Sequence, residues 1–138
     1  MPEFGKKSQA VLDTVDPRLQ EVLERIIPHY DFSVLSGFRD KVEQDEIFRQ
    51  GRSKKQWPNS KHNKNADGKT QLFSVAVDLA PYPIDWDDEP SFLYLAGMVM
   101  QQAADLGYEV RWGGDWDQDD EILSDQTFQD LGHFELVI

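Results

Sequence analysis

Phe73-Ser74-Val75-Ala76-Val77-Asp78-Leu79-Ala80 is the most regular stretch of the sequence, because apolar residues alternate with small or polar ones. This period of two is typical of a β-strand with one face toward the core. We expect the apolar face, beginning at Phe73, to be buried. The other face carries small residues and one acid, Asp78. A buried carboxylate costs on the order of several kcal/mol unless it is paired or binds a metal. The alternative is that Asp78 caps the turn toward Pro81.

The segments on either side of this strand predict helices and further strands. Asp16-Pro17 is typical of a helix start, and Gly51 and Gly107 are typical of residues that follow a helix end. The apolar spacing predicts helices at 17–27, 40–50 and 90–106 and strands at 32–35, 73–79, 110–112 and 133–138. Helices and strands mixed without strict alternation predict an α+β fold, with the helices packed on a small, mostly antiparallel sheet.

Length and composition restrict the class of protein. The 138 residues predict a single domain, 1–138, and we expect a monomer. The formal charge of −12 argues against nucleic acid as a partner, because phosphates require clustered Lys and Arg. The sequence has no apolar run long enough for membrane insertion and no signal peptide at Met1 to Ala10, so we expect a cytoplasmic start. Because cysteine is absent, any metal must be held by imidazole and carboxylate.

The three histidines differ in how well packing explains them. His29 follows a predicted helix, where a cation near the C-terminal end is a sufficient reason for it. His62 lies in the polar segment 52–70, which we expect to be a long surface loop. His133 opens the last predicted strand. Two neutral imidazoles and the carboxylate of Asp78 would leave Zn²⁺ one open position for water, as in catalytic zinc sites.

Four blocks of sequence, taken together, resemble one family. They are Ser36-Gly37-Phe38-Arg39, Ser60-Lys61-His62, Ala76-Val77-Asp78-Leu79 and Asp130-Leu131-Gly132-His133-Phe134-Glu135-Leu136. In this order they resemble the zinc metallopeptidase family of D-Ala-D-Ala carboxypeptidases, vancomycin-resistance D,D-dipeptidases and phage L-alanyl-D-glutamate endolysins. The blocks span about three quarters of the chain. The resemblance implies the α+β fold of these peptidases, which hedgehog signalling domains share.

The resemblance also implies roles for individual residues. His62, Asp78 and His133 would be the zinc ligands. Asp130, three residues before the last histidine, would be the general base that takes a proton from zinc-bound water and passes it to the leaving amine. Arg39 would hold a substrate carboxylate or the developing oxyanion, where a fixed positive charge counts most.

Three of these residues have alternative interpretations. Glu135 competes for the role of base, because it lies on the same strand face as the last histidine. It could instead support that ligand from outside the metal shell. Ser60 could orient substrate, although a loop serine needs no functional reason. Arg39 could form a surface ion pair with Asp40 or Glu43.

Two segments depart from the family pattern or add to it. Asp78 lies sixteen positions after His62, which is more than the family uses, and we expect the insert 63–72 to form a flap beside the site. The acidic stretch that follows Gly114 places acids at alternate positions, as calcium loops do. A calcium site there would use Asp115, Asp117, Asp119 and Glu121. It lacks the glycine of an EF-hand loop, so a solvated acidic loop is the alternative.

The resemblance implies hydrolysis of a peptide bond in peptidoglycan stem peptides, most specifically the L-alanyl-D-glutamate bond, by a phage endolysin. The short chain without an export signal or a separate cell-wall-binding domain favours this member of the family. An endolysin can wait in the host cytoplasm until it is released to the periplasm and wall. The alternatives are a D-Ala-D-Ala carboxypeptidase or dipeptidase on the same site, and a zinc-containing binding module without catalysis.

Overall fold

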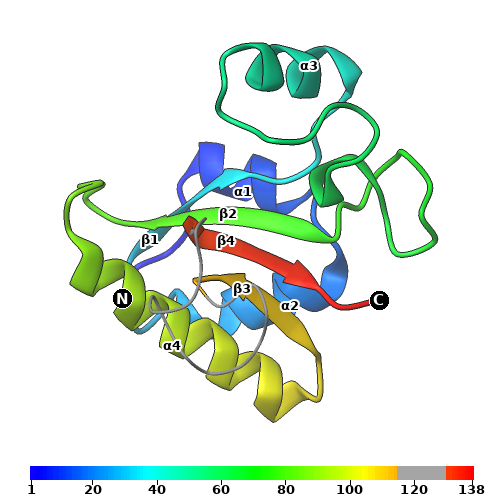
Figure 1. Ribbon diagram of the computed structural model, residues 1–138. Coiled ribbons are helices and arrows are strands. Elements are labelled where there is room, and N and C mark those ends of the chain that lie inside the picture. The colour runs from blue at the N-terminus through cyan, green and yellow to red at the C-terminus, as the bar shows by residue number, and fades with distance from the viewer. Residues whose placement is uncertain (115–129) are drawn as a thin grey trace.

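Four antiparallel strands form the centre of the structure (Figure 1). The computed structural model describes residues 1–114 and 130–138. The strands are β1 (Phe32–Ser36), β2 (Ala76–Pro81), β3 (Val110–Gly113) and β4 (Asp130–Leu136). Their order in the sheet is β1-β2-β4-β3, so the two central strands are β2 and β4. The α+β fold with an antiparallel sheet is confirmed.

Some of the helices pack directly on this sheet, and one lies apart from it. They are α1 (Lys6–Leu12), α2 (Pro17–Ile26), α3 (Lys41–Arg49) and α4 (Glu89–Leu106), with a short 3₁₀ helix, η1 (Lys61–Asn63). α4 packs on β2, β3, β4 and α2, and α1 packs on β1. α3 lies apart from these layers, at the top of Figure 1. None of the helices in the described parts of the chain is long and apolar enough to cross a membrane.

The three predicted helices are confirmed to within a residue, because their ends are set by local signals. The Asp16 carboxylate accepts a hydrogen bond from the backbone N–H of Arg18, and Pro17 occupies the first turn. Asp40 caps α3 in the same way. Gly107 ends α4 with φ of 79°, a left-handed conformation that glycine adopts without strain.

The start of β2 differs from the prediction. The strand begins at Ala76 rather than at Phe73, whose side chain is 43% exposed. The ladder partners of β2 on β4 begin with Glu135 opposite Ala76. The residues before Ala76 are instead held by the connection between α1 and α2, through a bridge between Ser74 and Val15. The apolar alternation therefore continues past the end of the strand itself.

β4 and α1 also differ from the expected boundaries. β4 starts at Asp130, three residues before the predicted start, because Asp130 pairs with Gly113 of β3. It ends at Leu136. The sequence pattern does not predict α1, which is short and largely polar. Its Ser8 hydroxyl accepts a hydrogen bond from the backbone N–H of Val34, so tertiary contacts stabilise this helix.

The two faces of the central strands have different roles. Val77, Leu79 and Phe134 are fully buried in the core on the face that packs against α4. Because side chains alternate along a strand, Asp78 and His133 lie on the opposite face. These two residues are direct partners in the β2–β4 register. The sheet thus places a carboxylate and an imidazole side by side without contribution from a loop.

Gly132 permits the close approach of β4 to β2 at this point. A Cβ atom added to Gly132 would collide with the backbone carbonyl of Leu79. Any larger residue would therefore push β4 away from β2. The glycine next to His133 in the predicted block is required by packing.

Candidate metal centre

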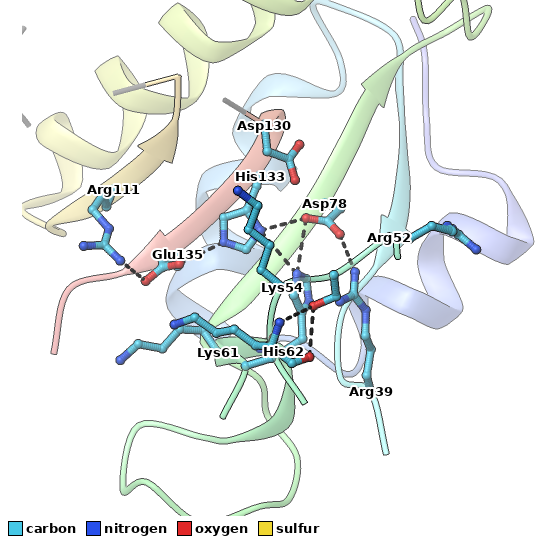
Figure 2. Close-up of a pocket in the computed structure, with 13 residues that line it drawn as sticks. Arg39, Arg52, Lys54, Lys61, His62, Asp78, Arg111, Asp130, His133 and Glu135 are labelled. Carbon is cyan, nitrogen blue, oxygen red and sulfur yellow. Dashed lines mark hydrogen bonds and ion pairs between the residues drawn. The ribbon is translucent and has the colours of Figure 1, made fainter. Parts of the chain in front are cut away.

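Three side-chain atoms converge on one point above the sheet (Figure 2). Nε2 of His62 lies 3.2 Å from Oδ1 of Asp78 and 3.3 Å from Nδ1 of His133. The last two atoms are 2.9 Å apart. A tetrahedral zinc site with bonds of about 2.1 Å places its ligand atoms about 3.4 Å from one another. The spacing of the three atoms therefore fits a single metal ion.

His62 is held by the backbone of the Ser36 to Arg39 block. Its Nδ1 lies 2.8 Å from the carbonyl oxygen of Gly37, and the backbone N–H of Arg39 donates to the carbonyl of His62. Ser60 caps η1, because its hydroxyl accepts from the N–H of His62. With Nδ1–H donating to Gly37, the lone pair on Nε2 is directed at the metal position.

His133 is oriented by a carboxylate on its far side. Its Nε2 lies 2.9 Å from Oε1 of Glu135, whose other oxygen accepts from Nη2 of Arg111 at 2.9 Å. This arrangement puts the proton on Nε2 and leaves Nδ1 for the metal. Carboxylates in this position fix the ring and raise the basicity of the ligand. The geometry therefore favours the supporting role for Glu135 over the role of base.

Asp78 divides its two oxygens between the metal position and an arginine. Oδ1 faces the histidines, and Oδ2 accepts a hydrogen bond from Nη2 of Arg39 at 2.8 Å. Asp78 thus does not serve as a cap for the turn at Pro81. The surface ion pair of Arg39 with Asp40 or Glu43 is likewise not what the structure shows.

The charges at the centre favour an ionised carboxylate beside a protonated imidazole. Burial alone would raise the pKa of Asp78, but His62 and His133 outweigh it and hold the pKa well below its usual range. Burial disfavours the charged form of His133, yet its hydrogen bonds to Asp78 and Glu135 raise its pKa to about 9. A metal that binds His133 therefore displaces a proton.

Asp130 lies at the edge of the same cleft, at the start of β4 (Figure 2). Its Oδ1 accepts from the backbone N–H of Gly132 at 3.3 Å. Burial and the nearby charge of Asp78 raise the pKa of Asp130 above its ordinary value. A carboxylate with a raised pKa is more basic when ionised, which suits proton transfer near neutral pH.

Two residues that position the site do not stand out in the sequence, Gln44 and Asn63. Gln44 is fully buried, and its Oε1 accepts from Nδ2 of Asn63 at 3.2 Å and from Nη1 of Arg39 at 3.4 Å. Asn63 also completes a capping box with Ser60. The spacing of Ser60 and Asn63 could have indicated this cap. Nothing in the local pattern distinguishes Gln44 from an exposed helix residue.

The metal centre lies in a cleft of about 280 Å³. Besides the three ligand residues, it is lined by Arg39, Arg52, Ser53, Lys54, Lys55, Ser60, Lys61, Arg111, Asp130 and Glu135. The insert 63–72 does not line it, and the flap expected beside the site stays a prediction. The segment that borders the centre is 52–55, which packs against α3 through Gln44. The four residues of the predicted calcium site lie outside the described residues.

Replacing Glu135 by Gln is expected to weaken zinc binding by about 10–100-fold, the usual effect of losing a partner behind a metal ligand. The amide keeps the size of the side chain but removes the charge that faces His133. Competition with a chromophoric chelator measures the affinity. Glu109→Gln, an exposed position, is the matched control. An unchanged affinity in Glu135→Gln would show that this carboxylate does not support the metal.

Comparisons with known proteins agree on one family. The sequence profile of the family described as phage L-alanyl-D-glutamate peptidase matches residues 2–137. An L-alanyl-D-glutamate peptidase of Escherichia phage T5 is 34% identical, over 98% of each chain. The crystal structure of the Serratia marcescens L-Ala D-Glu endopeptidase ChiX superposes with a TM-score of 0.72 at 28% identity, covering 97% of this chain and 89% of that one. With its fold, its His-Asp-His centre and these matches taken together, the chain belongs to the phage L-alanyl-D-glutamate peptidase family.

Proposed function

We propose that this protein is a zinc-dependent peptidoglycan peptidase that hydrolyses the L-alanyl-D-glutamate bond of stem peptides, as a phage endolysin. The observation that carries the proposal is the convergence of His62, Asp78 and His133 beside Asp130 in one cleft. The family description and both named relatives specify the same bond.

The residues present fit zinc better than a hard cation. Two imidazole nitrogens and one carboxylate oxygen are a usual catalytic zinc set, whereas magnesium and calcium prefer oxygen ligands. Each histidine also has an acceptor on its second nitrogen, Gly37 for His62 and Glu135 for His133. When bound, zinc lowers the pKa of a coordinated water to about 7 and polarises the scissile carbonyl.

The chain's own residues supply the proton transfer and the positive charge. We assign Asp130 as the general base, which accepts a proton from the attacking water and donates it to the leaving amine. Arg39 donates a hydrogen bond to Asp78 and adds a fixed positive charge beside the developing oxyanion. Ser60 and Glu135 act on the two histidines rather than on substrate.

The cellular setting follows from the same proposal. Residues 1–138 act as one catalytic domain and as a monomer. The protein acts on the stem peptides of the wall after release from the host cytoplasm, as expected for an endolysin.

Digestion of purified peptidoglycan tests the proposed bond. Released peptides are identified by mass spectrometry after amino-terminal labelling. The proposal predicts new D-glutamate amino ends and new L-alanine carboxyl ends. Loss of terminal D-alanine alone would identify a carboxypeptidase instead. An intact wall with zinc bound to the protein would favour the binding module.

A further inference from the structure

The strands β1, β2 and β4 lie side by side in the sheet (Figure 1), and three residues form a row across them. Ser36 of β1 pairs with Asp78 of β2, and Asp78 pairs with His133 of β4. Direct partners in an antiparallel sheet point their side chains to the same face. Ser36 therefore lies on the face of the metal centre, next to Asp78, although the proposed mechanism gives it no role.

A β-bulge brings Ser36 to this position. In the β1–β2 register, Val34 stands opposite Leu79. The register then shifts, so that Ser36 rather than Leu35 stands opposite Asp78. Without the shift, an apolar side chain would take this place beside the carboxylate. Bulges next to active sites commonly redirect a side chain in this way. The irregularity therefore places a hydroxyl beside Asp78.

The Ser36 hydroxyl is one of three acceptors around the guanidinium of Arg39. It accepts a hydrogen bond from Nε at 2.9 Å. Oδ2 of Asp78 accepts from Nη2 at 2.8 Å, and Oε1 of Gln44 accepts from Nη1 at 3.4 Å. Each guanidinium nitrogen therefore has its own partner, and the partners come from β1, β2 and α3. Because the guanidinium is planar and rigid, contacts on three sides fix both its position and its orientation.

Gln44 is itself held on its other side. It is the buried residue of α3, a helix whose other residues are exposed or half-buried. Its Nε2 donates to the carbonyl of Lys55 at 2.6 Å and to the hydroxyl of Ser53 at 3.0 Å. Its Oε1 also accepts from Nδ2 of Asn63 at 3.2 Å. A side-chain amide has two N–H donors and two acceptor lone pairs, and these contacts use all of them. Gln44 therefore offers Arg39 an oxygen whose position is fixed.

A fixed guanidinium matters for the rate because of where Arg39 lies. Its side chain lines the cleft and contacts Asp78 there (Figure 2). A long side chain held at one point keeps much of its rotamer freedom. Charges stabilise a transition state best when they are in place before the oxyanion develops. A displacement of about 1 Å can cost about 10²-fold in rate.

We propose that Ser36 and Gln44 are positioning residues for the cleavage reaction and act through Arg39. They hold the guanidinium on two sides while Asp78 holds the third, so that its charge is aligned before substrate binds. The inference rests on the proposed function. Neither residue is among the described residues that line the cleft, so their loss should act on kcat through Arg39.

Single replacements that remove each contact test this role. Ser36→Ala removes the hydroxyl, and Gln44→Met keeps the length of the side chain without its amide. The zinc-loaded proteins are compared on the synthetic peptide N-acetyl-L-Ala-D-Glu-L-Lys. Each variant is expected to lower kcat by about tenfold or more, the effect of losing one hydrogen bond to a charged group. KM should stay within about threefold of the wild type, because the interaction is needed in the transition state.

Matched variants separate the contact from the fold. Ser36→Thr keeps the hydroxyl and is expected to keep kcat close to that of the wild type. Ser33→Ala makes the same change on the same strand and is expected to cleave like the wild type. Gln50→Met, at the exposed C-cap of α3, is the control for the glutamine. The zinc content of every variant shows whether the ligand residues stay in place.

A double-mutant cycle with Arg39→Ala shows whether the effect passes through the guanidinium. In that background, Ser36→Ala and Gln44→Met are expected to lower the single-turnover rate by less than about twofold, because the group that they position is gone. NMR of the metal-free protein gives a readout without activity. Rotation about the Nε–Cζ bond of Arg39 is expected to be faster in both variants than in the wild type.

A second glutamine variant covers the case in which Gln44→Met does not fold. In Gln44→Glu the carboxyl still offers an oxygen to Arg39 in either protonation state, but the amide donors are lost. Its kcat is therefore expected to stay within about threefold of the wild type. A loss of about tenfold in Gln44→Glu would contradict a role that depends on this oxygen.

The remaining outcomes distinguish the positioning role from the function on which it rests. A wild-type kcat in Ser36→Ala or in Gln44→Met would overturn the positioning role and leave the peptidase standing. An equal loss with and without Arg39 would also overturn it, because the contacts would then serve only the fold. If even the wild type cleaved neither the peptide nor purified peptidoglycan, the proposed function itself would be overturned.

Discussion

Replacing Asp130 by Ala is expected to slow cleavage of the L-alanyl-D-glutamate bond by about 10²–10⁴-fold, the range for a general acid–base residue. Zinc should stay bound, because Asp130 contributes none of the three converging atoms. The loss arises because the other two carboxylates that line the cleft in residues 1–114 and 130–138 are already engaged: Asp78 faces the metal position and Arg39, and Glu135 faces His133. Single-turnover cleavage of a synthetic stem peptide measures the rate, and atomic absorption measures the zinc.

Two further variants make this result specific. Asp105→Ala removes an exposed acid of α4 and is expected to cleave like the wild type. Asp130→Asn keeps the size of the side chain and is expected to be as slow as the alanine variant. A rate close to that of the wild type in both Asp130 variants would overturn the assignment of the base.

Replacing Asp78 by Ala is expected to remove both zinc binding and cleavage. Asp78 provides one of the three ligand atoms and also pairs with Arg39, so the variant loses a bond to the metal and the negative charge that balances it. The fall in zinc affinity should exceed the about 10–100-fold expected for a supporting residue such as Glu135. Isothermal titration of the metal-free protein measures it.

Thermal unfolding separates loss of the metal from loss of the fold. A ligand that binds only the folded state raises the Tm, so zinc should stabilise the wild type and leave Asp78→Ala unchanged. Asp31→Ala, at a half-buried position before β1, is the control and should respond to zinc like the wild type. If Asp78→Ala bound zinc with wild-type affinity, the metal centre would have to lie elsewhere.

The parts of the fold that the sequence could predict are those set by neighbours along the chain. The helix that begins at Pro17 and the helix that ends before Gly107 have caps that can be read locally. The start of β2 could not be predicted in this way. It depends on where β4 offers partners, and those residues lie far along the chain. The helix α1 depends likewise on its contact with β1 through Ser8.

In the candidate site, too, some features could be predicted from the sequence and others depend on tertiary contacts. The three candidate ligands were predicted from sequence blocks that resemble a family, and the structure brings their side chains together in an arrangement that could hold a metal ion. The spacing of residues along the sequence could not show that Asp78 of β2 and His133 of β4 are direct partners in the sheet. It also could not show that Gln44 fixes the segment 52–55, because the atoms that Gln44 contacts belong to a loop without regular structure. Contacts of this kind are decided by tertiary packing.

Titration of the metal-free protein with Zn²⁺, followed by the appearance of new D-glutamate amino ends in digested peptidoglycan, tests whether the His62, Asp78 and His133 centre performs the cleavage. The account predicts no new ends in the presence of chelator. It predicts that activity rises with added zinc and reaches its full value at one ion per chain. The Asp78→Ala variant should show no activity at the same concentrations. New D-glutamate ends that form at the full rate in chelator, or equally in Asp78→Ala, would contradict it.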